Sequence, residues 1–154
     1  MIMLALLVYI LFLSVSEIKG HDEVCYGKYG CFSDSGEFQG IFTQLPASPA
    51  SVAPTFSLFT RLTPPSMRHG ELLNDSNMTK LQTSTFNTKS LTKLIVHGYI
   101  EPKFGIRDWM LRMKNELLTR NDYNVILLSW HHGNDFPYIQ AAANTRIVAA
   151  MLSE

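Results

Sequence analysis

The chain contains two short, continuous apolar runs that predict buried β-strands. Residues 94–96 read Leu-Ile-Val, and residues 125–128 read Val-Ile-Leu-Leu. An apolar run without polar alternation, rich in β-branched side chains, is typical of a strand that is covered on both faces of a sheet. We therefore predict two strands of this buried kind.

Each apolar run is followed by a stretch that predicts a helix. Apolar residues recur every three or four positions from Ile106 to Leu117, which predicts a helix from Trp109 to about Arg120 with Asp108 as its N-cap. Pro137 begins a second helix, because proline is favoured in the first helical turn. The order strand, helix, strand predicts parallel strands joined by a right-handed crossover.

The residues before the first apolar run predict antiparallel edge strands. Phe56 and Leu58 alternate with polar residues in segment 55–62, which predicts a half-exposed strand. Segment 80–86 predicts a second edge strand, segment 66–77 a loop, and the proline-punctuated segment 32–54 an extended, irregular crossing. The predicted fold class is therefore α/β, with antiparallel edge strands followed by a parallel β-α-β-α unit.

The first twenty residues predict a targeting segment. Residues 1–15 are apolar apart from Tyr9 and Ser14, which is too short for a membrane span of ~20 residues. We interpret residues 1–20 as a secretory signal peptide, cleaved after Ser16 or Gly20, and residues 21–154 as the secreted part. An uncleaved N-terminal anchor is the alternative, because no Lys or Arg precedes the apolar segment.

The predicted secretion and the charge balance indicate which modifications and partners to expect. Cys25 and Cys31 are the only cysteines, so in an oxidising compartment we expect a disulfide, with two free thiols as the alternative. Asn74 and Asn77 each begin an Asn-x-Ser/Thr sequence and are candidate glycosylation sites. The 13 basic and 13 acidic residues balance, so nothing electrostatic favours nucleic acid or an anionic membrane as a partner. We expect no nucleic-acid partner and no transmembrane span.

The end of the first apolar run carries the most informative motif, His97-Gly98-Tyr99. Gly98 permits a sharp turn and allows a backbone N–H to remain unpaired. A buried strand that ends in His-Gly-aromatic is how many α/β-hydrolases begin their oxyanion hole. We expect the Tyr99 N–H to be the first oxyanion donor, with His97 and Gly98 supporting the shape of the loop.

A metal site is the alternative use of the histidines. His97, His131 and His132 could act as ligands together with Asp135. The sequence disfavours this site, because no ligand pair is spaced i, i+4 on a helix and the adjacent His131 and His132 would point in different directions. We therefore expect no metal, and we interpret His131 and His132 as polar loop residues.

Four stretches, in the same order, resemble the pancreatic lipases and their lipase-related proteins. They are residues 23–33, residues 94–101 with the His-Gly-Tyr motif, residues 128–130 followed by Gly133, and Tyr138 with Ala141 and residues 144–148. The resemblance implies a secreted α/β-hydrolase that cleaves triacylglycerol or phospholipid esters at a lipid–water interface through a Ser-Asp-His triad. It also implies that Tyr99 supplies the first oxyanion N–H and that Cys25 and Cys31 form a disulfide.

The sequence departs from the family in one important respect. It has no Gly-x-Ser-x-Gly motif and no credible Ser-Asp-His set, and the family's triad and calcium ligands come after the matched region. We therefore expect an N-terminal fragment with an incomplete α/β-hydrolase sheet, truncated before the nucleophile strand, inactive alone and without a cofactor. The alternatives are a non-catalytic lipid- or protein-binding relative and a secreted phospholipase. The need for a colipase-like partner is left open.

Overall fold

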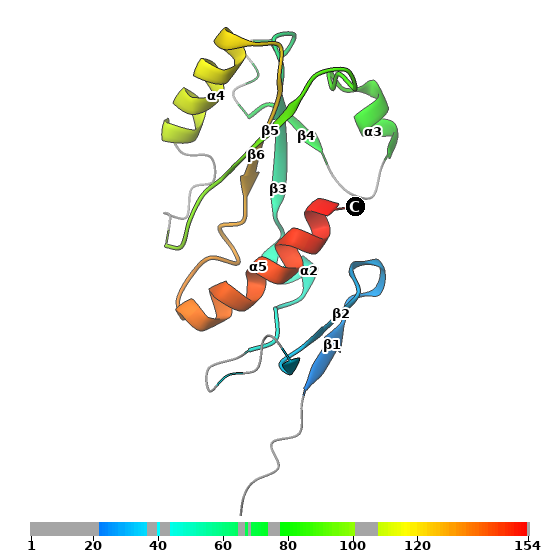
Figure 1. Cartoon of the computed structure of the whole chain (residues 1–154), viewed down its shortest axis with the longest axis vertical. Coiled ribbons are helices and arrows are strands. Elements are labelled where there is room, and N and C mark those ends of the chain that lie inside the picture. The colour runs from blue at the N-terminus through cyan, green and yellow to red at the C-terminus, as the bar shows by residue number, and fades with distance from the viewer. Residues whose placement is uncertain are drawn as a thin grey trace, which may run out of the picture.

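A four-stranded mixed sheet forms the centre of the protein (Figure 1). The computed structural model describes residues 22–36, 40, 44–64, 67, 69–73, 78–100 and 108–153. Strand β5 lies parallel to β6, whereas β3 lies antiparallel to both β4 and β6. These strands confirm the α/β class and the parallel pairing that the sequence predicted. In spatial order the strands are β4 (Glu71–Leu73), β3 (Thr55–Phe59), β6 (Asn124–Ser129) and β5 (Thr92–Val96).

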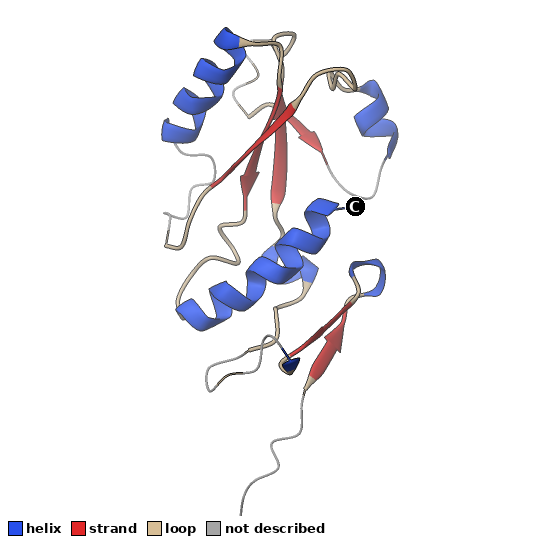
Figure 2. Cartoon of the chain, viewed as in Figure 1, coloured by secondary structure: helices blue, strands red, loops and turns tan. Residues whose placement is uncertain are grey.

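Two helices cover opposite faces of β6. Helix α4 (Asp108–Arg120) connects β5 to β6, and helix α5 (Tyr138–Ser153) follows β6 (Figure 2). Leu127 belongs to the apolar cluster that contains Met110 of α4, and Leu128 belongs to the cluster that contains Ile147 of α5. Because consecutive strand residues point to opposite faces, β6 is covered on both, as predicted.

The prediction for β5 was wrong on one face. Ile95 is buried against the α4 cluster, but Leu94 and Val96 on the other face are 40% and 43% exposed. In the described part of the chain, β5 is an edge strand whose only sheet partner is β6. An edge strand has fewer neighbours to cover it than a central strand with the same apolar sequence.

The predicted antiparallel edge also needs correction. Strand β3 is not half-exposed, since Phe56 to Phe59 are buried between the neighbouring strands. Segment 80–86 does not form an edge strand, because α3 (Met78–Thr83) is a helix in that region. The edge strand is instead β4, which lies in the segment predicted to be a loop. Its pairing with β3 joins Leu73 to Phe56, a long-range contact that local sequence does not specify.

The N-terminal part is more ordered than the predicted irregular crossing. Strands β1 (Glu23–Cys25) and β2 (Cys31–Ser33) form a hairpin around a short 3₁₀ helix, η1 (Gly27–Tyr29). Cys25 and Cys31 form the expected disulfide across this hairpin. The short helix α2 (Pro49–Val52) begins after Ser48, whose side chain accepts the Ser51 N–H at 3.1 Å.

Within the described helices the buried faces also differ from a simple periodic pattern. Met113 of α4 is 48% exposed, although its spacing placed it on the apolar face. Helix α5 buries polar Asn144 beside Ile147 and Val148.

No helix in the described ranges is long and apolar enough to span a membrane. The proposed signal peptide (residues 1–20), the sequons at Asn74 and Asn77, and Ile106 lie outside the described residues.

Candidate functional site

The loops that follow β5 and β6 lie together at one edge of the sheet. This is expected, because parallel neighbouring strands end on the same side. The indole Nε1–H of Trp130 donates to the His97 carbonyl oxygen at 2.9 Å, and the Trp130 backbone N–H donates to His97 Nε2 at 3.0 Å. The two rings stack with centroids 5.9 Å apart. Both residues are buried, so the two loops are joined through a buried contact with two hydrogen bonds.

The hydrogen bonds around His97 define its tautomer. Because Nε2 accepts the Trp130 N–H, a neutral His97 ring carries its hydrogen on Nδ1. That Nδ1–H donates to the Gly98 carbonyl oxygen at 3.1 Å, and the side-chain amide of Asn134 donates to the same oxygen at 2.8 Å. His97 Nδ1 and Asn134 Nδ2 lie 3.2 Å apart, and as two donors they share one acceptor rather than bonding to each other.

This pairing determines the direction of the next backbone N–H. In a trans peptide unit the C=O and the following N–H point to opposite sides. Since the Gly98 carbonyl points toward His97 and Asn134, the Tyr99 N–H points away from them. Among the described residues the Tyr99 N–H makes no hydrogen bond, whereas the next N–H, of Ile100, donates to the Asn134 carbonyl oxygen at 3.1 Å.

The turn is made by a different residue from the one that the sequence suggested. Ile100 has φ 52°, in the left-handed region, whereas Gly98 does not. A β-branched residue is rarely found there, so the conformation must be imposed by the surrounding contacts. A side chain at Gly98 would meet none of the described residues within 4 Å, and Gly98 does not provide the left-handed turn.

Asn144 of helix α5 holds the loop that follows β6. Its side-chain amide donates to the Gly133 carbonyl oxygen at 2.9 Å, and its Oδ1 accepts the Ala47 N–H at 2.8 Å. Gly133 packs so closely on α2 that an added Cβ would lie 2.7 Å from Val52. Sequence reasoning missed Asn134 and Asn144, because a polar residue in a loop or on a helix normally indicates exposure. The one available signal was an asparagine among the small and apolar residues of α5.

His131 and His132 do not form the metal site considered as an alternative. Their rings lie 4.0 Å apart, but no metal-binding cluster within the described residues includes them, His97 or Asp135. Burial lowers the pKa of His131 below its ordinary value, and electrostatic interaction with the nearby His132 and His97 rings lowers it further. His131 Nδ1 lies 3.2 Å from Ser129 Oγ. This Ser-His pair cannot be a nucleophile and base for an external substrate, because Ser129 is only 2% exposed.

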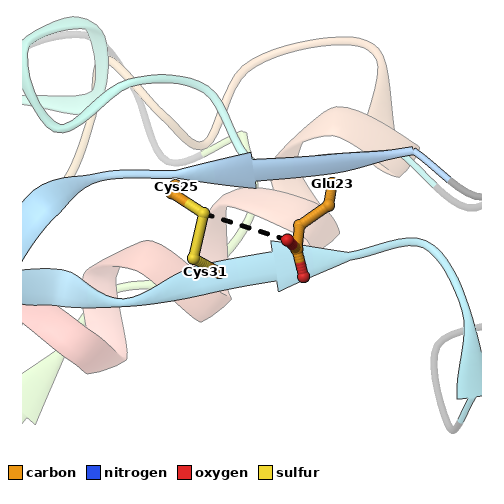
Figure 3. Close-up of side chains that lie close together, drawn as sticks. All are labelled: Glu23, Cys25 and Cys31. Carbon is orange, nitrogen blue, oxygen red and sulfur yellow. Dashed lines mark hydrogen bonds between the residues drawn. A yellow bond between two sulfur atoms is a disulfide. The ribbon is translucent and has the colours of Figure 1, made fainter.

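One cluster in the described chain has the right residue types for a metal, namely Glu23, Cys25 and Cys31 (Figure 3). The two sulfurs are bonded to each other, so neither is a thiolate that could bind a metal. Glu23 Oε2 lies 3.9 Å from Cys25 Sγ, a contact rather than a hydrogen bond because the oxidised sulfur carries no hydrogen. The cluster is therefore a structural feature of the hairpin.

Apolar and aromatic side chains lie exposed next to the His97 loop. The Tyr99 and Tyr138 rings meet edge to face, with centroids 5.0 Å apart. Phe136 is 82% exposed, and Ile100 is also exposed. An exposed apolar patch next to an unpaired N–H is suited to a substrate with an apolar part.

A separate groove lies at the other end of the sheet, between the end of β3 and helix α4. The Arg61 guanidinium donates there to the carbonyl oxygens of Leu118 and Thr119, so it closes the end of the helix. The Lys114 ammonium lies 4.7 Å from the Phe59 ring centroid, and burial lowers the pKa of Lys114. These cations already have structural partners within the fold.

A mixed sheet with helices on both faces of β6 and a His-Gly-Tyr loop at its carboxyl edge defines an α/β protein. The family model for lipases matches residues 22–154. This chain belongs to the lipase family, as the sequence resemblance indicated.

Individual relatives support the same assignment. The chain is 35% identical over 149 residues to the pancreatic triacylglycerol lipase of Ictidomys tridecemlineatus, covering 94% of this chain and 30% of that protein. It is 32% identical over 136 residues to inactive pancreatic lipase-related protein 1 of Canis lupus familiaris, covering 86% and 28%. The chain spans about three-tenths of the length of these curated relatives.

Proposed function

We propose that this chain belongs to a secreted carboxylic ester hydrolase of the lipase family, acting on triacylglycerol or phospholipid esters, in which the Tyr99 N–H is the first oxyanion donor. The observation that carries the proposal is the Tyr99 N–H, which has no hydrogen-bond partner among the described residues. Its direction follows from the two hydrogen bonds that the Gly98 carbonyl oxygen accepts. Similarity to a protein named triacylglycerol lipase supports the substrate class.

The chemistry explains why such an N–H is useful. When a nucleophile attacks an ester, negative charge develops on the carbonyl oxygen, and a donor already aimed at that oxygen needs no reorganisation. One donor of this kind contributes about 10²–10³-fold in kcat. Backbone groups do this work without a bound cofactor, and the exposed Ile100 and Phe136 suit an acyl chain at a lipid–water interface.

The 154 residues by themselves are proposed to be inactive, because they contain no Gly-x-Ser-x-Gly nucleophile motif. The test is an assay of residues 22–154 with p-nitrophenyl butyrate and with a tributyrin emulsion. We expect no hydrolysis above a heat-treated control. A soluble monomer that unfolds cooperatively and hydrolyses either ester would contradict this part of the proposal.

A hybrid protein tests the oxyanion role directly. Residues 22–154 replace the matching segment of the Ictidomys tridecemlineatus lipase, to which this chain is 35% identical over 149 residues. We expect the hybrid to hydrolyse tributyrin. Tyr99→Pro, which removes the N–H, should lower kcat about 10²–10³-fold, whereas the matched control Tyr99→Phe keeps the N–H and most of the activity. A folded hybrid in which both variants have equal kcat would overturn the oxyanion role.

A non-catalytic lipid- or protein-binding relative is the second candidate function. The observation that favours it is the similar identity, 32%, to a relative named inactive. A folded hybrid that binds tributyrin droplets without hydrolysing them would support this alternative and contradict the enzyme proposal.

Sequencing the N-terminus of the protein secreted from cells tests the signal peptide, and mass spectrometry of the same sample tests glycosylation at Asn74 and Asn77.

A further inference from the structure

We propose that Asn134 is the positioning residue that sets the direction of the Tyr99 N–H. Its catalytic consequence rests on the proposed function, whereas its effect on the loop can be measured independently. Asn134 bonds the loop that carries Tyr99, so its role is to position the Tyr99 N–H and not to take part in the reaction.

Asn134 holds the backbone on both sides of Tyr99. Its side-chain amide donates to the carbonyl oxygen of the Gly98–Tyr99 peptide at 2.8 Å. Its backbone carbonyl oxygen accepts the N–H of the Tyr99–Ile100 peptide at 3.1 Å. One residue from the loop after β6 therefore restrains both peptide planes that flank Tyr99. Asn134 itself is 2% exposed, so its side chain is held in one place between the two loops.

The side-chain chemistry must be that of an amide donor. The Gly98 carbonyl oxygen already accepts the His97 Nδ1–H at 3.1 Å, and a second donor completes its two lone pairs. A carboxylate at position 134 would place an acceptor oxygen 2.8 Å from the Gly98 oxygen, which is repulsive. The Gly98–Tyr99 peptide would then rotate, and the Tyr99 N–H would no longer point directly away from His97 and Asn134.

The left-handed Ile100 adds a second link between the same two loops, made by the backbone of Asn134. A β-branched residue with φ 52° is unfavourable unless its neighbours hold it. The bond from the Ile100 N–H to Asn134 is the hydrogen bond that holds this peptide within the described chain. The Ile100 N–H donates to the backbone carbonyl of Asn134, which any residue at position 134 supplies. Loss of the side-chain amide should therefore loosen Ile100 only through release of the adjoining Gly98 carbonyl.

The test compares two buried asparagines on the same strand–loop unit. Asn134→Asp keeps the size of the side chain but loses the donor. Asn124→Asp is the matched control, because Asn124 is equally buried but donates to the Asn87 and Ser90 carbonyl oxygens at the start of β6. Both changes should lower the melting temperature. Kinetics are measured in the hybrid at a temperature where circular dichroism shows that parent and variants are folded.

We expect Asn134→Asp to lower kcat about 10–100-fold with little change in KM, because the donor is misdirected while the apolar binding surface remains. Asn124→Asp should keep the parent kcat. A folded Asn134→Asp hybrid with the parent kcat, or equal losses in both variants, would overturn the proposal. Asn134→Ala, which removes the donor without adding a repulsive oxygen, should give a smaller loss of kcat.

A spectroscopic measurement separates this proposal from the proposed function. In ¹⁵N-labelled residues 22–154, Asn134→Asp should shift the Tyr99 amide resonance and speed hydrogen exchange at Ile100, whereas Asn124→Asp should do neither. An inactive but folded parent hybrid would contradict the proposed function and leave this result to decide the role of Asn134. Unchanged Tyr99 and Ile100 signals in Asn134→Asp would overturn the positioning role whether or not the hybrid is active.

Discussion

Strands β5 and β6 have nearly interchangeable apolar sequences but very different surroundings. Leu127 and Leu128 in β6 are buried, whereas Leu94 and Val96 in β5 are 40% and 43% exposed. β6 lies between β3 and β5 with a helix on each face, and β5 contacts only β6 and the α4 side within the described residues. Hydrophobicity therefore indicates that a segment is a strand, but the neighbours decide how much of its surface is buried.

The difference has consequences for both stability and association. An exposed apolar strand edge has unpaired backbone groups and can pair with other chains. Side chains in β6 should accordingly contribute more to the free energy of unfolding than side chains in β5. Substitutions in the two strands test this comparison directly.

The largest expected effect is at Leu127, in the centre of β6. Leu127→Ala leaves a cavity in the cluster beneath α4, so the free energy of unfolding should fall by about 3–5 kcal/mol. Urea unfolding of residues 22–154, followed by tryptophan fluorescence and circular dichroism, measures the change. A loss below about 1 kcal/mol would show that the β6 core relaxes freely, contrary to the comparison.

The next effect is at Asn124, which ties the start of β6 to the segment before β5. Its side-chain amide donates to the Asn87 and Ser90 carbonyl oxygens, and its Oδ1 accepts the Asn87 N–H at 2.9 Å. Asn124→Ala leaves these buried groups unpaired and should cost about 1–3 kcal/mol of unfolding free energy. The same urea titration measures it, and a change within about 0.5 kcal/mol would mean that water replaces the lost bonds.

A smaller effect is expected at Leu94, on the exposed face of β5. Leu94→Ala removes a side chain that is already 40% exposed, so the loss should be no more than about 1 kcal/mol. The measurement is repeated at several protein concentrations. A loss as large as that of Leu127→Ala would reveal that Leu94 is covered in solution, and a concentration dependence would identify a second copy as the cover.

The smallest effect is a pH dependence at the end of β6. Burial lowers the pKa of His131, so the native state binds a proton less readily than the unfolded chain. The stability that depends on neutral His131 is fully present above about pH 6.5 and is lost as the pH falls below that value through the lowered folded-state pKa. His131→Gln should therefore reduce the slope of unfolding free energy against pH between about 7.5 and 5.5. A slope equal to that of the parent would contradict this assignment.

The sequence by itself determined the elements with strong local signals. Apolar runs predicted β5 and β6, helical spacing predicted α4, and Pro137 marked the start of α5, because each signal depends on neighbouring residues alone. The His97-Gly98-Tyr99 motif and the order of the matching stretches were sufficient to indicate the lipase family, which the family model over residues 22–154 confirms.

Only the tertiary structure decided the features that depend on partners far away in the chain. Segment 71–73 is a strand because β3 pairs with it, and β5 is half-exposed because of its place at the edge. Asn134 can be buried because its side chain bonds Gly98, 36 positions earlier in the chain. In the same loop, Ile100 and not Gly98 has the left-handed backbone conformation. The cost of burying a polar group depends on whether a partner is present, and that partner is not encoded in the local pattern.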